Sequence, residues 1–315
     1  MTIKFVGETI PITRVMTGFH SFDRAFINHD GDIGFPIRTV AEVYGPNHVG
    51  KSTFWYTLAA IICKNLGGKI AMLDLEGFDH KFVETVLTYA GYKGDVNLIS
   101  LDTDEDELKE LADSLGKGYT VGILDSIGGI APIGEIEGKL YEANMGRRGM
   151  LMARLSRRIL HIQRKAWYEN KKSSIVLATN HQHLRMGGTY DMLSAGPVVT
   201  PGGETKNYLS SVRILMRRKE KFPDGSYTIH GKVTKNKWGI CFQEFDMFCL
   251  SGRGFHLGLT AMLDCINLKL ATRKKGGMVA IGKTNTAKLS TLVKKADDPE
   301  IFEPFVEALK NYDKE

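Results

Sequence analysis

The sequence predicts an α/β fold, with a mainly parallel central β-sheet flanked by helices and a small C-terminal α/β unit. Short β-branched runs alternate with helical patterns along most of the chain, which is typical of parallel strands joined by crossover helices. A strand series joined by FPDG and WG turns follows. From about Gly254 the pattern changes to two or three helices and a Gly/Lys-rich piece, which indicates a separate unit.

The expected elements follow one another in a regular order. The N-terminal segment 1–15 alternates like a strand. Strands are then expected at 38–45, 69–76, 96–102, 121–127 and 173–180. Helices are expected between them at 51–66, 80–91, 104–118 and 144–169. The closing strand series covers 210–221, 226–237 and 239–248.

Composition narrows the class of protein. The 315 residues carry 42 Lys+Arg against 36 Asp+Glu, a net charge of +6 and a pI near 9.0. This mild excess allows nucleic acid as a partner only if the charge is concentrated in one place. The four cysteines show no CxxC spacing, which argues against a zinc site or disulfide framework and fits a reduced, cytosolic protein. We expect neither a signal peptide nor a membrane span.

Residues 45–52, GPNHVGKS, match the phosphate-binding pattern G-x-x-x-x-G-K-[ST] between an expected strand and an expected helix. Glycines let successive backbone N–H groups face inward as an anion nest at the positive end of the helix. Lys51 is expected to reach the β- and γ-phosphates, and the Ser52 hydroxyl to bind Mg²⁺. A chance Gly-Lys turn is the alternative. The expected nucleotide-binding residues here are Gly45, Pro46, Asn47, His48, Val49, Gly50, Lys51, Ser52 and Thr53.

Two later strands end in carboxylates that suit the same chemistry. Asp125 ends an apolar strand at the expected nucleotide edge of the sheet, and we expect it to hold the magnesium. Taken alone, such an aspartate is also a common turn residue. Asp74 and Glu76 alternate at the end of another strand. Glu76 is the candidate general base or water-positioning residue, and an exposed loop carboxylate is the alternative.

With these motifs in order, the chain resembles the RecA family of recombinases over nearly its whole length. The P-loop lead-in VMTGFHSFDRAF, the segment LDLEGFD, the strand ILDSIGGIAPIGEIEG, the loop closure TPGGETKNYLSSVRILMRR and the segment KVTKNKWG carry the resemblance. It implies a RecA-like P-loop ATPase core with two DNA-binding loops. The expected division is a short N-terminal strand segment at 1–20, the core at 21–253, and a small C-terminal domain at 254–315.

Two departures from the family pattern stand out. The family usually has Asn-Gln at the end of the strand IVLATN, where the glutamine senses the γ-phosphate; here the residues are Asn180 and His181, as in phage recombinases of the UvsX type. His181 is the candidate sensor and catalytic residue, Gln182 is the second candidate, and a structural histidine is the alternative. The N-terminal helix that docks on a neighbouring subunit in the family is not expected in this chain.

Positive charge gathers in the expected helix after Asp125. Residues 139–165 contain eight basic residues and one acidic residue, Glu142, an excess of +7. Arg147, Arg154 and Arg158 are spaced for one helical stripe. A solvated helix is the alternative to a phosphate-binding one. The resemblance places the first DNA-binding loop at 135–146 and the second within 183–203. The expected DNA-binding residues are Arg147, Arg148, Arg157, Arg185, Gly202 and Gly203.

Lys235 and Lys237 lie two residues apart on an expected strand, so their side chains should face one way. The resemblance implies that both contact ATP bound to the adjacent subunit; an exposed basic strand is the alternative. Phe82 is a candidate cover for the adenine, or a core residue.

The resulting hypothesis is a DNA-dependent ATPase that uses ATP and Mg²⁺ to bind single-stranded DNA. It would promote homologous pairing and strand exchange with duplex DNA, as a helical filament, in recombination and repair in a bacterial or phage-infected cell. The alternatives are a RecA-fold regulator or loader without strand exchange, and a nucleotide-switched DNA-binding protein with negligible turnover.

Overall fold

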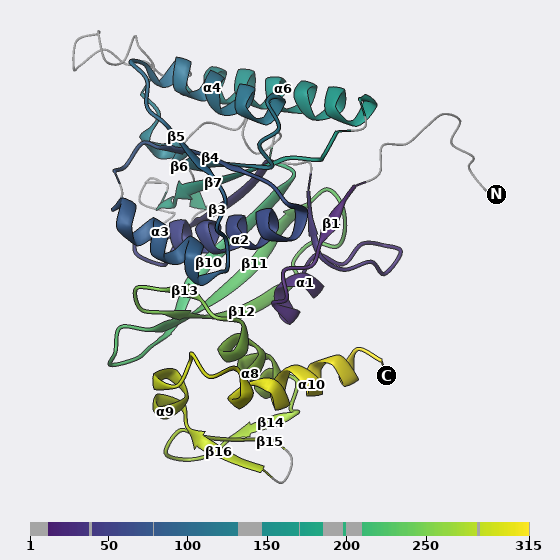
Figure 1. The fold of residues 1–315 in the computed structure, drawn as a ribbon, viewed down its shortest axis with the longest axis vertical. Coiled ribbons are helices and arrows are strands. Elements are labelled where there is room, and N and C mark those ends of the chain that lie inside the picture. The colour runs from purple at the N-terminus through teal and green to yellow at the C-terminus, as the bar shows by residue number, and fades with distance from the viewer. Residues whose placement is uncertain are drawn as a thin grey trace, which may run out of the picture.

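A computed structural model of the chain describes residues 12–37, 40–77, 79–131, 147–169, 171–184, 198–199, 210–281 and 284–314. A nine-stranded sheet forms its centre, and a smaller unit with a three-stranded sheet follows it (Figure 1). The α/β fold with a mainly parallel central sheet, predicted from the sequence, is therefore confirmed.

The large sheet has a parallel part and an antiparallel part. The parallel strands, in spatial order from the centre to one edge, are β10 (Val212–Lys221), β3 (Val40–Gly45), β7 (Ile175–His181), β6 (Val121–Asp125), β4 (Ile70–Asp74) and β5 (Val96–Ile99). The antiparallel extension beyond β10 consists of β11 (Tyr227–Asn236), β12 (Glu244–Leu250) and β13 (Gly254–Phe255). The parallel strands all end at one edge, where the P-loop lies.

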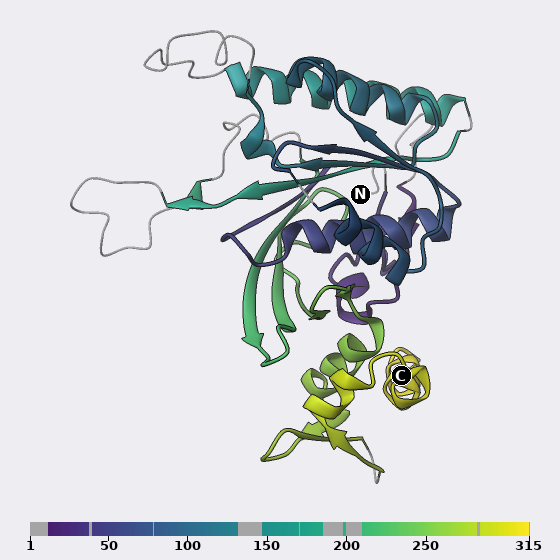
Figure 2. The same ribbon diagram turned by 60° about the vertical axis from the view of Figure 1, so that its left-hand side comes forward.

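Helices cover both faces of the parallel part. The helices α2 (Lys51–Leu66) and α3 (His80–Tyr89) lie on one face, and α4 (Asp104–Gly116) and α6 (Arg147–Tyr168) lie on the other (Figures 1 and 2). Alternating residues of each strand supply the two cores. On β7, Ile175 and Leu177 join the core under α2, whereas Val176 and Ala178 join the core under α4 and α6. The alternation thus fixes which face each strand residue occupies.

Smaller elements surround this sheet. The first described strands, β1 (Arg14–Val15) and β2 (Phe35–Pro36), pair with each other, and α1 (His20–Arg24) lies between them in the sequence. A short 3-10 helix, η1 (Ile127–Gly129), follows β6, and β8 (His183–Leu184) pairs with β9 (Val198–Val199). Most of the expected N-terminal strand at 1–15 lies outside the described residues. No helix in the described ranges is both long and apolar enough to span a bilayer.

The C-terminal unit has its own core. The helices α8 (Leu257–Asn267), α9 (Leu289–Lys294) and α10 (Glu303–Tyr312), with the short η2 (Pro299–Ile301), pack with the small sheet of β14 (Ala271–Arg273), β15 (Met278–Ile281) and β16 (Thr284–Lys288). Phe255 still packs in the main core, and β13 pairs with β12. Phe248 and Leu250 of β12 nevertheless belong to the C-terminal core. The two cores therefore overlap along the chain near the expected boundary, and the division into domains stays a prediction.

Candidate nucleotide-binding site

The P-loop follows β3 and leads directly into α2. Gly50 has a φ of 89°, in the left-handed region that favours glycine. A Cβ at Gly45 would lie 2.2 Å from the carbonyl oxygen of Met216 on β10, and a Cβ at Gly50 would lie 2.1 Å from the Tyr227 hydroxyl on β11. Two strands distant in sequence therefore leave no room for a side chain at either glycine of the pattern.

Two residues that the sequence analysis missed hold the outer side of this loop. The Arg218 guanidinium lies over the Tyr227 ring, 4.2 Å from its centroid, and donates a hydrogen bond to the backbone carbonyl of His48. Burial raises the pKa of the Tyr227 hydroxyl, which stays protonated. Arg218 thus connects the P-loop to β10 and β11. Only the register of β10 against β11 brings the pair together, so no local signal identified it.

Lys51 is the first residue of α2 and is 7% exposed. Its ammonium group donates hydrogen bonds to the carbonyl oxygens of Pro46, at 2.9 Å, and Gly45, at 3.3 Å. Burial lowers the pKa of Lys51, while the carboxylates of Glu76 and Asp125 raise it and only partly offset that effect. The lysine thus carries its charge among loop carbonyls and two carboxylates, at the place where phosphates would bind.

Asp125 ends β6 and is 4% exposed. The Tyr56 hydroxyl donates to its Oδ2 at 3.0 Å, and the Thr179 hydroxyl donates to its Oδ1. Tyr56, whose pKa burial and Asp125 raise, also contacts the Ser52 hydroxyl. The two expected magnesium ligands, Ser52 and Asp125, are therefore neighbours on either side of one tyrosine. Tyr56 and Thr179 were not anticipated from the sequence.

The Ser52 hydroxyl and the Asp125 carboxylate fit the binding of Mg²⁺ together with a nucleotide. Carboxylate and hydroxyl oxygens suit Mg²⁺, which usually keeps waters and binds through one or two protein groups plus phosphates. Within the described ranges, no group of three or more His, Cys, Asp or Glu residues is placed to enclose a metal ion. The protein alone therefore offers part of a coordination sphere, which is the arrangement expected for a metal that arrives with a phosphate.

Glu76, His181 and Asn47 form a hydrogen-bonded chain across the end of the sheet. The Nε2 atom of His181 lies 2.6 Å from Oε1 of Glu76, and its Nδ1 atom lies 2.9 Å from Oδ1 of Asn47 in the P-loop. Both ring nitrogens of His181 therefore lie within hydrogen-bond distance of an oxygen atom. The chain connects the candidate base, the candidate sensor and the P-loop directly.

The electrostatic surroundings keep Glu76 ionised. Burial raises its pKa, but hydrogen bonds from Ser126 and His181 and the charges of His181 and Lys51 outweigh that effect, so the pKa is lowered. Ser126, which follows Asp125, donates to the same Oε1 atom as His181. Glu76 therefore has the charge that a general base requires, and Ser126 is a further residue that the sequence analysis missed.

A second polar network lies beside the first, inside the sheet. Glu42 on β3 is fully buried; its Oε1 accepts a hydrogen bond from Asn180 at 2.7 Å, and its Oε2 accepts one from Arg213 Nε at 2.7 Å. The Arg213 guanidinium also lies 4.6 Å from the centroid of the Tyr44 ring. Because Asn180 precedes His181, this network joins the end of β7 to β10.

Lys235 lies beside this network, on β11 opposite Arg213. Burial first, and then the nearby charges of Lys237 and Arg213, lower its pKa to about 8, although Glu42 and Cys241 raise it. β11 ends at Asn236, so Lys237 follows the strand instead of lying on it as expected. The pair lies two strands away from β3, and its role stays a prediction.

The remaining nucleotide candidate and the DNA candidates are only partly described. Phe82 is half-buried and packs against the main core, which favours the core alternative. Arg147 and Arg148 begin α6, and the Arg157 side chain is exposed. Arg185, Gly202, Gly203, the whole of the first loop and most of the second loop lie outside the described residues.

The expectation that α6 lacks balancing acid is wrong for part of the helix. The neighbouring α4 carries six acidic residues and one lysine. Arg158 of α6 pairs with Asp113 of α4, with Nη2 and Nε at 2.5 and 2.9 Å from Oδ1, and Arg154 lines a groove between the two helices. The stripe of Arg154 and Arg158 thus faces an acidic helix, a contact that spacing within α6 does not reveal.

Comparison with known proteins agrees with this geometry. Residues 5–256 match the model of the RecA N-terminal domain family. The chain is 31% identical to Protein RecA of Latilactobacillus sakei over 263 residues, 80% of this chain and 68% of that protein. It is 26% identical to Protein RecA of Ruminococcus albus, over 86% of this chain and 65% of that protein, and 30% identical to Protein RecA of Rippkaea orientalis, over 85% and 75%. The chain therefore belongs to the RecA family, whose members are DNA-dependent ATPases of recombination and repair.

Proposed function

We propose that this chain assembles on single-stranded DNA as a helical filament, using ATP and Mg²⁺, and promotes pairing and strand exchange with a homologous duplex. The observation that carries the proposal is the hydrogen-bonded chain from Glu76 through His181 to Asn47 of the P-loop. It connects the candidate base, the candidate sensor and the phosphate loop in one site. The proposal assigns this activity to the cytoplasm of a bacterial or phage-infected cell.

In the proposed mechanism, Glu76 accepts a proton from the attacking water. Its lowered pKa keeps the carboxylate ionised at neutral pH, and its position among Lys51, Ser126 and His181 orients it. Ser52 and Asp125 would hold Mg²⁺, which neutralises charge on the phosphates during transfer. Lys51 leaves the carbonyls of Gly45 and Pro46 to contact the β- and γ-phosphates.

His181 would report on the γ-phosphate. As an imidazolium it can donate one hydrogen bond to a phosphate oxygen and keep the other donor for Glu76 or Asn47. A change of partner at His181 therefore also changes the contacts of the base. Because β8 begins at His183, a shift at His181 would reach the expected second DNA-binding loop within a few residues.

The lysine pair would connect neighbouring copies. Lys235 and Lys237 are proposed to contact the nucleotide of the adjacent subunit. In the strand order, β11 lies on one side of β3 and β4, which Glu76 follows, lies on the other. Arg147, Arg148, Arg157, Arg185, Gly202 and Gly203 are proposed DNA contacts. Of these, the exposed side chain of Arg157 on α6 supports the proposal.

Electron microscopy with single-stranded DNA and a slowly hydrolysed ATP analogue tests the assembly. Continuous helical filaments are expected. Discrete particles that still hydrolyse ATP would contradict the filament and favour the regulator or loader. Strand exchange between a circular single strand and a linear homologous duplex then tests the activity itself, and the absence of joint molecules from well-formed filaments would contradict it.

The variant Glu76→Gln tests the role of the base. We expect DNA-stimulated phosphate release to fall about 100-fold or more, because general base catalysis typically contributes that factor. Binding of ATP and of single-stranded DNA should be retained. Glu84→Gln, which removes one exposed carboxylate from α3, is the matched control and should keep normal turnover. Normal turnover in Glu76→Gln would show that another group activates the water.

A further inference from the structure

Residues 237–243 form the β11–β12 turn, which joins the two strands. Lys237, one of the two lysines proposed to contact a neighbouring nucleotide, is the exposed first residue of this turn. Because β11 ends at Asn236, contacts outside the strand decide where Lys237 lies. These contacts come from the residue before β10 on one side and from the segment after α1 on the other.

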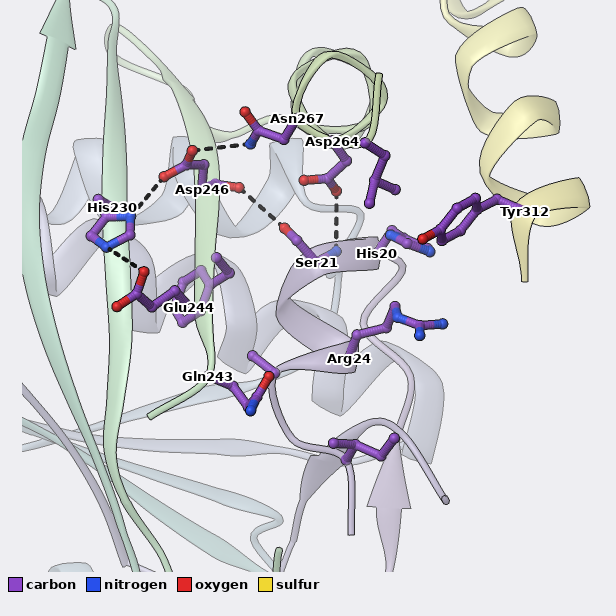
Figure 3. Close-up of a pocket in the computed structure, with 14 residues that line it drawn as sticks. His20, Ser21, Arg24, His230, Gln243, Glu244, Asp246, Asp264, Asn267 and Tyr312 are labelled. Carbon is purple, nitrogen blue, oxygen red and sulfur yellow. Dashed lines mark hydrogen bonds and ion pairs between the residues drawn. The ribbon is translucent and has the colours of Figure 1, made fainter. Parts of the chain in front are cut away.

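Backbone hydrogen bonds hold the β11–β12 turn from both sides. The Lys237 N–H donates to the carbonyl oxygen of Ser211, which precedes β10, at 2.9 Å. The Ile240 N–H donates to the carbonyl oxygen of Ile27, in the segment after α1, at 3.0 Å. Gln243, the last residue of the turn, lies beside α1 in Figure 3 and lines one cavity with Ile27. The turn therefore packs directly against the segment that follows α1.

Arg14 on β1 connects this turn to the segment after α1. Its Nη2 atom donates a hydrogen bond to the carbonyl oxygen of Trp238, in the turn, at 2.6 Å. Its Nη1 atom donates to the carbonyl oxygens of Phe26, at 2.5 Å, and Gly34, at 3.0 Å. Because the guanidinium is planar and rigid, these bonds fix the position of the Trp238 carbonyl relative to the segment after α1.

The surroundings of Arg14 make this bridge specific. Arg14 is half-buried, and burial lowers its pKa, which the charge of Asp32 only partly offsets. An arginine keeps its charge in proteins, so a cation is held here among neutral carbonyl oxygens. The indole Nε1 of Trp238 is buried without a hydrogen-bond partner among the described residues. The Trp238 N–H donates to Oδ1 of Asn236 at 3.0 Å, so the printed bond that joins Trp238 to another segment is the one from Arg14.

We propose that Arg14 is a positioning residue for the ATP site of the neighbouring copy. It holds the β11–β12 turn so that Lys237, and Lys235 before it, can contact the nucleotide of that copy. The inference rests on the proposed role of the lysine pair. Arg14 acts through the Trp238 carbonyl, which belongs to the residue directly after Lys237. Loss of Arg14 would therefore misplace the lysines and leave the P-loop of the same copy unchanged.

Mixed filaments test this division between two copies. Arg14→Gln alone should release phosphate on single-stranded DNA at least about tenfold more slowly than the unchanged chain, because small misplacements of positioning groups lower rates strongly. Glu76→Gln lacks the proposed base but has an intact turn. In a random equal mixture, about a quarter of the head-to-tail interfaces pair an intact base with an intact turn.

Phosphate release by the mixture of Arg14→Gln and Glu76→Gln should therefore rise to about a quarter of that of the unchanged chain, above either variant alone. A neighbouring turn cannot compensate for a defect in the Arg14→Gln copy's own nucleotide site or fold. A mixture no more active than its components would overturn the proposal. Normal phosphate release by Arg14→Gln alone would also overturn it.

The double variant Lys235→Ala/Lys237→Ala separates this inference from the proposed function. Mixed with Glu76→Gln, it should recover in the same way, because the lysines are supplied by the neighbouring copy. Recovery of the lysine variant without recovery of Arg14→Gln would overturn the role of Arg14 alone. If the lysine variant does not recover, the proposed role of the lysine pair is wrong, and the inference fails with it.

Two further variants control for loss of charge and for misfolding. Arg24→Gln removes a half-exposed arginine of α1 that pairs with Asp313 at 2.8 Å, and it should release phosphate normally. Gly239→Ala displaces the turn and leaves Arg14 in place, since a Cβ at Gly239 would lie 2.3 Å from the Ile27 carbonyl oxygen. It should show the same loss and the same recovery in mixtures, also if Arg14→Gln does not fold. Normal phosphate release by Gly239→Ala would overturn the proposal.

Discussion

Glu42 on β3 and Asp264 on α8 are both buried carboxylates, yet they differ in how their oxygens are satisfied. Both oxygens of Glu42 accept hydrogen bonds at 2.7 Å, from Asn180 and Arg213. One oxygen of Asp264 accepts a hydrogen bond from Ser21, and the other has no partner among the described residues. The first carboxylate lies inside a sheet, and the second lies where two units of the chain meet.

The difference shows in which part of the molecule a buried carboxylate finds hydrogen-bond donors for both of its oxygens. Around Glu42, the strands β3, β7 and β10 are held side by side in fixed register, so donors arrive at defined positions on both sides. At Asp264, elements of the core and of the C-terminal unit approach one another and leave a cavity. The hydrogen bonds of Glu42 are completed within the sheet, whereas one oxygen of Asp264 stays buried without a partner among the described residues.

The largest effect is expected at the nucleotide end of the sheet. Lys51→Ala should reduce phosphate release roughly 1,000-fold or more, because it removes the cation proposed to contact the transferred phosphate. The pKa of Asp264 is about 6, and ¹³C NMR of its labelled carboxyl carbon can follow this titration. If the two regions are independent, the midpoint should be unchanged in this variant. Phosphate-release assays and the ¹³C titration measure both, and a shifted Asp264 midpoint would show that the regions are coupled.

Glu42→Gln should lower the free energy of unfolding by about 3–5 kcal/mol, because it removes the buried carboxylate that pairs with the partly buried Arg213 charge. Urea denaturation followed by circular dichroism measures this change. The control Glu220→Gln breaks a pair with Arg273 in which both side chains are substantially exposed, and it should cost less than about 1 kcal/mol. Equal changes in the two variants would mean that Glu42 is no better integrated than a surface residue.

Asp264→Asn is expected to stabilise the chain at neutral pH. The folded pKa of about 6 exceeds the ordinary value of 3.8, so the stability that Asp264 contributes is present below pH 4 and is lost as the pH rises through 6. A difference of about two pKa units corresponds to roughly 3 kcal/mol as an upper limit. Urea denaturation at pH 7.5 and at pH 4 should show a gain that shrinks at the lower pH, and a pH-independent difference would contradict this account.

The smallest effect concerns Lys235, which loses its charge as the pH rises through about 8. If it contacts the nucleotide of a neighbouring copy, assembly with ATP on single-stranded DNA should weaken up to about tenfold between pH 7 and pH 9. Light scattering measures the assembly. Lys235→Arg keeps its charge over this range and should lack the decline, so the same decline in both proteins would assign it to another group.

Local patterns were sufficient for the parallel sheet and the nucleotide edge. Glycines, one lysine and a hydroxyl at fixed spacing predict the P-loop, and carboxylates at strand ends predict that Glu76 and Asp125 lie near it. The structure brings these residues together, because parallel strands end at one edge. The sequence also indicated His181 at the same edge, although not its contacts with Glu76 and Asn47.

Other parts of the site depend on strands that are far apart in the sequence. Arg218, Tyr227 and Ser126 carry no recognisable spacing, since their positions follow from the register between strands and from the loop after β6. The expectation that α6 lacks balancing acidic residues was wrong for the same reason. Its acidic partner α4 is distant along the chain but adjacent in space, as the pairing of Arg158 with Asp113 shows.

The sequence by itself thus determined the α/β alternation, the phosphate loop and the carboxylates that follow the strands. These depend on the dihedral preferences of glycine and on periodicities within a few residues. The tertiary structure alone decided which buried charges found partners. Glu42 meets Asn180 and Arg213 across three strands, whereas one buried oxygen of Asp264 has no partner among the described residues. Hydrogen bonding and desolvation depend on neighbours that only the packed chain supplies.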